Sequence, residues 1–247
     1  MQSGIATDPG ADQRGYSTLT PRKARELLRI RRAEVEDEHG SLPADSSTWN
    51  DFAVRESDVR GSCKGVGMAS AQSLSESDRR LVAAWAADCA ERVLFLFESE
   101  APDDDRPRDG IARARAFAAG TLDVSGEIRR RFVAGRASHA VTSPAAKAAA
   151  WAAGQAAGVA HMGAHALGAA AYAAKARQLS EPDDVAAAAE EIRWQIAQMS
   201  DQVRAALRSL PLLGQDDSGP LGSGLLASGA LGAHIRVIQR ALHESLP

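Results

Sequence analysis

The chain has 247 residues and a formal net charge of −3, and 45% of its residues are hydrophobic while only 4% are aromatic. The near balance of 29 basic and 32 acidic residues gives no global field for nucleic acid or anionic lipid, so neither is expected as a partner. Much of the apolar content is alanine, the strongest helix former, which favours closely packed helices.

Residues 1–73 are predicted to form an extension in front of the main domain. Residues 1–19 are rich in Gly, Asp, Ser and Thr, a composition typical of disorder, and they lack the apolar run of a signal peptide. Residues 20–40 predict a helix, since Thr20 can cap its start and Gly40 can end it. A polar, irregular linker comes after this helix.

Cysteine usage and hydropathy indicate a cytoplasmic protein. Cys63 and Cys89 fit no zinc or redox spacing, which favours two free thiols in a reducing compartment. The Ala-rich run 145–176 is long enough to cross a bilayer, but it carries charged and histidine side chains and few large apolar ones. We therefore expect no membrane partner.

Residues 74–247 are predicted to form an all-α domain, a bundle of about six or seven helices. Serine caps, early prolines and closing glycines mark the helix ends, and no segment shows strand alternation. The expected helices span 78–98, 106–119, 124–141, 144–178 (one helix or a pair), 181–208 and a short closing helix to about 243.

Two patterns within these helices predict details of packing. The run VLFLF at 93–97 is apolar on all sides, so this helix end is expected deep in the core. Glycines recur every four or five residues from Gly154 to Gly168, although each costs about 1 kcal/mol in a helix relative to alanine. This spacing predicts a kink or the close approach of another backbone.

His161 and His165 lie four residues apart, a spacing that places both imidazoles on one face of a helix. With His139 as a third ligand, and Asp88 or Glu91 as a carboxylate, they would suit zinc or another divalent transition metal. The other interpretation is that the histidines line a pocket or pair with acidic side chains on a tightly packed helix. No cofactor is predicted, and a transition metal is the alternative.

Asp88 and Glu91 flank Cys89 on a helix with one buried face. Paired carboxylates can perform acid–base chemistry, but no nucleophile or cofactor motif accompanies them. A structural or binding role is favoured, with Arg92 or the arginines of RPR, Arg106 and Arg108, as ion-pair partners. The phosphate-loop, dinucleotide, zinc-protease and nucleophile-elbow signatures are absent, so no catalytic residue is predicted.

Four blocks in the chain are SDRRLVAAWAADCAERVLFLFE, DDDRPRDGIARARAFAAG, AAKAAAWAAGQAAGVAHMGAHALGAAAYAAKA and AAAEEIRWQIAQM. In this order, over residues 77 to about 208, they resemble the immunity proteins of bacterial polymorphic-toxin systems. The resemblance implies an all-helical protein that binds and neutralises a cognate toxin in the producing cell, and it carries over no catalytic residue. It maps recurring polar positions onto Asp88, Glu91, Arg106, Arg108, His139, His161, His165 and Trp194.

Gln155 departs from this pattern, because it stands where the family pattern has a histidine, which argues against a site of four histidines. The leading hypothesis is a non-enzymatic immunity or self-protection protein that binds a protein toxin or a toxic small molecule. The alternative is a metal-dependent enzyme or small-molecule-binding bundle that uses His139, His161, His165 and nearby carboxylates. The sequence leaves the toxin, the ligand and any homo-oligomer open.

Overall fold

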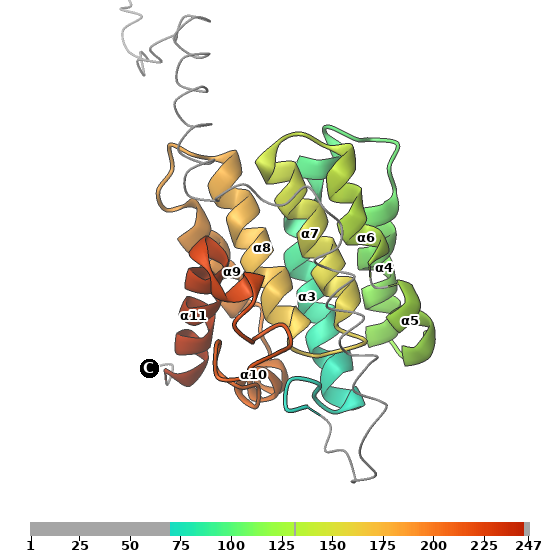
Figure 1. The fold of residues 1–247 in the computed structure, drawn as a ribbon, viewed down its shortest axis with the longest axis vertical. Helices are drawn as coiled ribbons and strands as arrows, with labels where there is room; N and C mark the ends of the chain where they lie inside the picture. The colour runs from blue at the N-terminus through green and yellow to red at the C-terminus, as the bar shows by residue number, and fades with distance from the viewer. Residues whose placement is uncertain (1–69, 131, 245–247) are drawn as a thin grey trace, which may run out of the picture. The chain divides into compact units, whose positions relative to one another are not determined.

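The computed structural model describes residues 70–130 and 132–244, and they fold into helices, as the sequence predicts (Figure 1). The predicted tail, the helix at 20–40 and most of the linker lie outside these residues. The chain divides into the units 1–66 and 67–247, and the described residues all belong to the second. Its described α-helices are α3 (Glu76–Glu98), α4 (Arg106–Ala118), α5 (Val124–Arg130), α6 (Val133–Arg136), α7 (Pro144–Gly158), α8 (His165–Ser180), α9 (Ala187–Ala197), α10 (Asp201–Arg208) and α11 (Gly229–His243).

Three helices, α3, α7 and α8, lie side by side at the centre of this unit (Figure 1). The helices α4, α5 and α6 pack on the side of α7, and α9, α10 and α11 pack on the side of α8 and α3. Glu100, just after α3, accepts hydrogen bonds from the amides of Thr142 (2.9 Å) and Ser143 (3.3 Å), just before α7. The end of α3 therefore meets the start of α7, so these two helices run antiparallel.

The helix starts predicted from local sequence are confirmed for α3 and α7. Ser75 accepts a hydrogen bond from the amide of Asp78 (3.1 Å), and Ser143 accepts one from the amide of Ala146 (3.2 Å). Such side chains satisfy backbone donors that the first turn leaves unpaired. At the end of α4, Gly120 has a φ of +79°, the left-handed conformation that a closing glycine adopts without strain.

The core at α7 and α8 is built almost entirely from alanine, as the composition predicts. Small side chains let the helix backbones approach one another closely. A Cβ on Gly154 of α7 would lie 2.9 Å from the Cα of Gly135 in α6, and one on Gly168 of α8 would lie 2.3 Å from the Gln155 Oε1. The predicted close approach of another backbone is confirmed at Gly154, whereas the group packed against Gly168 is a side chain.

The Ala-rich segment forms two helices, and the break between them contains His161. α7 ends at Gly158 and α8 begins at His165, so the prediction that both histidines share a face of one helix is wrong. Gly158 and Gly163 lie at the break, where a Cβ would come within 3.0 Å of the His165 ring and within 2.5 Å of Leu74, respectively. The amide of Gly163 donates outside the helices, to the carbonyl of Ser73 (3.1 Å). The connection is therefore held by the segment that precedes α3.

Gln72 fastens this preceding segment to the rest of the unit. Its carbonyl accepts from the amide of Ala164 (3.0 Å), and its side-chain nitrogen donates to Asp216 (2.6 Å) and to the carbonyl of Ser218 (2.8 Å). Its side-chain oxygen accepts from the amide of Leu221 (2.9 Å). Residue 72, which the sequence places in the extension, is thus buried against the helical unit.

The predicted helix at 181–208 is also divided, and it begins later, at Ala187. Ser200 starts α10 by accepting an amide hydrogen bond from its first turn (3.2 Å). Arg204 donates to the carbonyl of Ile196 (2.7 Å) and so satisfies the open end of α9. With the division of 124–141 into α5, α6 and a 3₁₀ turn, these breaks raise the number of described α-helices to nine. In the described part of the chain, none of these helices has the length and apolar character needed to traverse a bilayer.

Candidate binding surface

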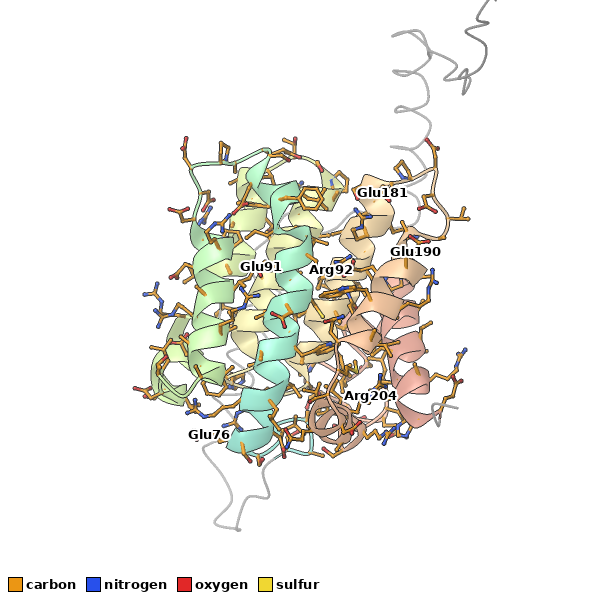
Figure 2. The ribbon with its side chains drawn as sticks, turned by 180° about the vertical axis from the view of Figure 1, so that it is seen from behind. Glu76, Glu91, Arg92, Glu181, Glu190 and Arg204 are labelled. Atoms are coloured by element: carbon orange, nitrogen blue, oxygen red, sulfur yellow. The ribbon has the colours of Figure 1, made fainter. Side chains whose placement is uncertain are left out.

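The outward side of α3 is the candidate functional surface, together with the side chains of α4 and α9 that border it (Figure 2). We call it the α3 face. Figure 2 shows Glu91 and Arg92 on opposite flanks of α3, toward α4 and α9. Its members are Asp88, Glu91, Arg92, Phe95, Glu98, Arg108, Arg115, Glu190 and Trp194.

Phe95 is the largest apolar side chain that α3 presents to solvent. It is 53% exposed, whereas Val93, Leu94 and Phe97 of the same apolar run are buried. The expectation that the whole run lies in the core is wrong at Phe95, because neither α4 nor α9 covers the strip of α3 between them. An exposed phenylalanine gives up apolar burial, and this makes Phe95 a candidate contact residue.

Arg92 and Trp194 form a stacked pair at the α9 border of the face. The Arg92 guanidinium lies over the Trp194 ring, 4.0 Å from its centroid. Its Nε donates to both carboxylate oxygens of Glu191, at 2.9 and 3.2 Å. The Glu191 side chain is fully buried while that of Arg92 is 38% exposed. A buried acid thus holds a surface arginine flat against an aromatic ring.

A buried hydrogen-bond network holds the Glu191 side chain on the inner side of the α3 face. The side-chain nitrogen of Gln195 donates to Glu191 (3.2 Å) and to the carbonyl of Ala170 in α8 (3.1 Å). The indole of Trp85 in α3 donates to the backbone carbonyl of Gln195 (2.8 Å). Cys89 lies in the same region, and burial, together with the Glu191 charge, raises the pKa of its thiol. Cys89 is therefore a buried core residue.

Asp88 and Glu91 border the face on the α4 side and share one arginine, Arg115. Arg115 Nη2 donates to Asp88 at 2.8 Å and also to Glu91. This hydrogen bond lowers the pKa of Glu91, and the two carboxylates raise the pKa of Arg115. The predicted pairing with Arg92 or with the RPR arginines is wrong, since a helix turn of α4 brings Arg115 opposite these acids.

Arg108 belongs to the same border, whereas Arg106 lies apart from it. Arg108 pairs with Glu98 at the end of α3. Arg106 makes a two-pronged pair with Asp104, at 2.8 and 2.5 Å, which lowers the pKa of that carboxyl. Arg106 also lines a shallow depression between α4, α5 and α6, in which the other arginines are likewise paired with carboxylates.

The three predicted histidines lie away from the α3 face. His139 is exposed in the 3₁₀ turn 137–140. His161 and His165 are half-buried at the α7–α8 connection, with ring centroids 6.3 Å apart. His165 Nδ1 hydrogen-bonds the Gln155 side-chain oxygen at 2.8 Å, so an amide is one of its partners. Over 70–130 and 132–244, no three histidine, cysteine or acidic side chains gather in a group that could hold a metal ion.

The structure therefore brings four predicted residues together, Asp88, Glu91, Arg108 and Trp194, and separates the others from them. Sequence reasoning missed Phe95, Arg115 and Glu191, and it named Arg92 only as an ion-pair partner of Asp88 and Glu91. One signal was present, since Phe95 falls in line with Asp88 and Arg92 at helical spacing.

Comparison with known proteins supports the resemblance found in the sequence. A family model described as "Imm-5 like putative immunity protein" matches residues 72–202, just over half of the chain. Searches among curated proteins and among solved structures found no match. The matched residues begin at Gln72 and end at the start of α10, so they include the α3 face. The chain belongs to the family of Imm-5 like immunity proteins.

Proposed function

We propose that this protein neutralises a cognate protein toxin by binding it through the α3 face, without catalysing a reaction. The observation that carries the proposal is the exposed Phe95 beside the Arg92–Trp194 pair. Membership of an immunity family supports a role in protection from a toxin. The proposal adds the kind of partner and the surface that meets it.

The composition of the face suits protein recognition. Binding energy in protein interfaces concentrates in a few aromatic and arginine side chains, surrounded by contacts that exclude water. Phe95, Arg92 and Trp194 are such anchors, and the ion pairs of Arg115 and Arg108 surround them on the α4 side. Because Phe95 and Arg92 are exposed, Trp194 is half-buried and none of the three is enclosed in a cavity, a protein partner fits these anchors better than a small molecule.

The charges on the face also favour binding over catalysis. A general acid or base needs a proton that it can exchange at neutral pH. The hydrogen bond from Arg115 instead lowers the pKa of Glu91, which keeps that carboxylate ionised. Glu98 and Asp88 are likewise committed to arginines. Such pairs form a fixed pattern of charge that a partner can recognise.

The test is co-expression of the full chain with the toxin encoded in its own gene cluster. We expect the two proteins to copurify and the cells to survive toxin expression. Phe95→Ala should weaken the complex by about tenfold or more, the range of an interface anchor. Val237→Ala on α11 is the matched control, since Val237 is similarly exposed (44%) but lies on another helix.

Two results would contradict the proposal. One is a wild-type chain that neither binds nor protects against any toxin of its gene cluster. The other is a complex whose affinity is unchanged by both Phe95→Ala and Val237→Ala, which would show that the toxin does not bind at Phe95.

A further inference from the structure

Arg92 is held in place without using the outer end of its guanidinium group. Its hydrogen bonds to Glu191 come from Nε, and its contact with Trp194 comes from the face of the group. The terminal nitrogens Nη1 and Nη2 donate to no acceptor in the part of the chain that the structure describes. A fixed pair of amino groups is thus left at the surface.

The arginines of α4 are arranged differently. Arg106, Arg108 and Arg115 each donate from the terminal Nη2 to a carboxylate of this chain. In each of them, a terminal nitrogen is already used in an ion pair within this chain. Arg92 is oriented by the fold and keeps both outer nitrogens available.

We propose that the outer edge of Arg92 binds a carboxylate side chain, Asp or Glu, of the toxin. This inference rests on the proposed function and names the chemistry recognised at its surface. The Nη1 and Nη2 groups lie in one plane, and two carboxylate oxygens match such a pair with parallel hydrogen bonds. The Trp194 ring covers one side of the guanidinium and excludes water there, which strengthens a charged hydrogen bond.

Glu191 acts in this scheme as a positioning residue that does not touch the toxin. Its buried carboxylate sets the direction of Nε and therefore the direction of the outer edge. Gln195 holds Glu191 in turn, because its side-chain nitrogen donates both to Glu191 and to the carbonyl of Ala170 in α8. An arginine oriented in advance loses less conformational freedom when it binds.

The experiment measures affinity between the full-length chain and the toxin of its gene cluster for Arg92→Lys. Lysine keeps the charge but lacks the planar pair of amino groups, so we expect the complex to weaken by about tenfold or more. Arg236→Lys on α11 is the matched control, because Arg236 is exposed on a helix outside the α3 face, and we expect this substitution to leave affinity unchanged. Urea unfolding of both variants checks that they remain folded.

A second arm identifies the acid on the toxin. Each surface Asp and Glu of the toxin is changed to Asn or Gln and combined with Arg92→Lys in a double-mutant cycle. One toxin acid should lose its effect in the Arg92→Lys background, while the others remain additive. Wild-type affinity in Arg92→Lys, or additivity at every toxin acid, would overturn the inference while leaving the proposed function intact. A wild-type chain that binds no toxin would overturn both.

Discussion

Gly154 of α7 and Gly135 of α6 lie backbone against backbone, so close that a Cβ on Gly154 would come within 2.9 Å of the Gly135 Cα and amide nitrogen. Alanine at 154 would gain helix propensity but would force the two helices apart. We expect Gly154→Ala to lower the free energy of unfolding by about 1–3 kcal/mol, the usual cost of overpacking. Urea unfolding measures it.

The control for this prediction is Gly126→Ala in α5. A Cβ there would meet only Asp123 Oδ1, at an ordinary 3.5 Å. This substitution should be neutral or slightly stabilising, since alanine is the better helix former. Equal effects of the two substitutions would show that the close contact at Gly154 does not govern stability.

The buried Glu191 is expected to contribute to stability as well as to the α3 face. Glu191→Gln removes the charge that Arg92 pairs with and leaves the Gln195 network with a weaker partner. Because Arg92 can turn toward water, we expect a loss of about 1–2 kcal/mol, below the cost of stranding a fully buried charge. Urea unfolding of Glu190→Gln provides the control, since the neighbouring Glu190 side chain is 60% exposed. A loss no larger than that control would contradict the role given to Glu191.

His234 on α11 predicts a dependence of stability on pH. Burial against α8, with a smaller effect of the Lys175 charge, lowers the pKa of His234 below its usual 6.5. As pH falls below about 6.5, His234 becomes protonated in the unfolded chain but stays neutral in the folded chain, so the free energy of unfolding declines. Above that pH both states are neutral and the contribution is constant.

The measurement is the urea midpoint at about pH 8 and about pH 5.5 for the wild type and His234→Gln. Carboxylates titrate in both proteins, so only the difference between them reports His234. The wild type should lose more stability than the variant on acidification. The same loss in both proteins would exclude His234 as its source.

Metal content is the test for the two histidines of the α7–α8 connection. His165 is bonded to Gln155, and no third ligand joins the pair among residues 70–130 and 132–244. We expect protein purified without a histidine tag to hold less than about a tenth of an equivalent of zinc, cobalt, nickel or manganese after supplementation. Stoichiometric metal that disappears in His161→Ala would contradict this expectation.

Local sequence predicts the features that depend on a few neighbouring residues. Ser75 and Ser143 cap helices because the bond joins residues three apart, and the helical class follows from alanine content. The predicted boundary between α8 and α9 is wrong, since Ser180 continues one helix where the sequence suggests the start of the next. At such a position tertiary packing outweighs capping preference.

The candidate surface is predictable only in part, because its geometry depends on which sides of α3 are covered. Nothing near Phe95 in sequence tells whether a neighbouring helix packs over it. Likewise Arg115 meets Asp88 and Glu91 across a distance of 24 to 27 residues. The sequence marks Gln155 as a departure from the family pattern, but its hydrogen bond to His165 forms only because the chain turns between α7 and α8.

The alanine core of α7 and α8 has a consequence for how this protein tolerates change. Truncating a large core side chain opens a cavity, but an alanine can be shortened only to glycine. Most substitutions at these positions must therefore enlarge the side chain and separate the helices. Substitutions in the central helices are therefore expected to destabilise the fold mainly by overpacking, whereas the exposed positions of α3 can change without separating the helices.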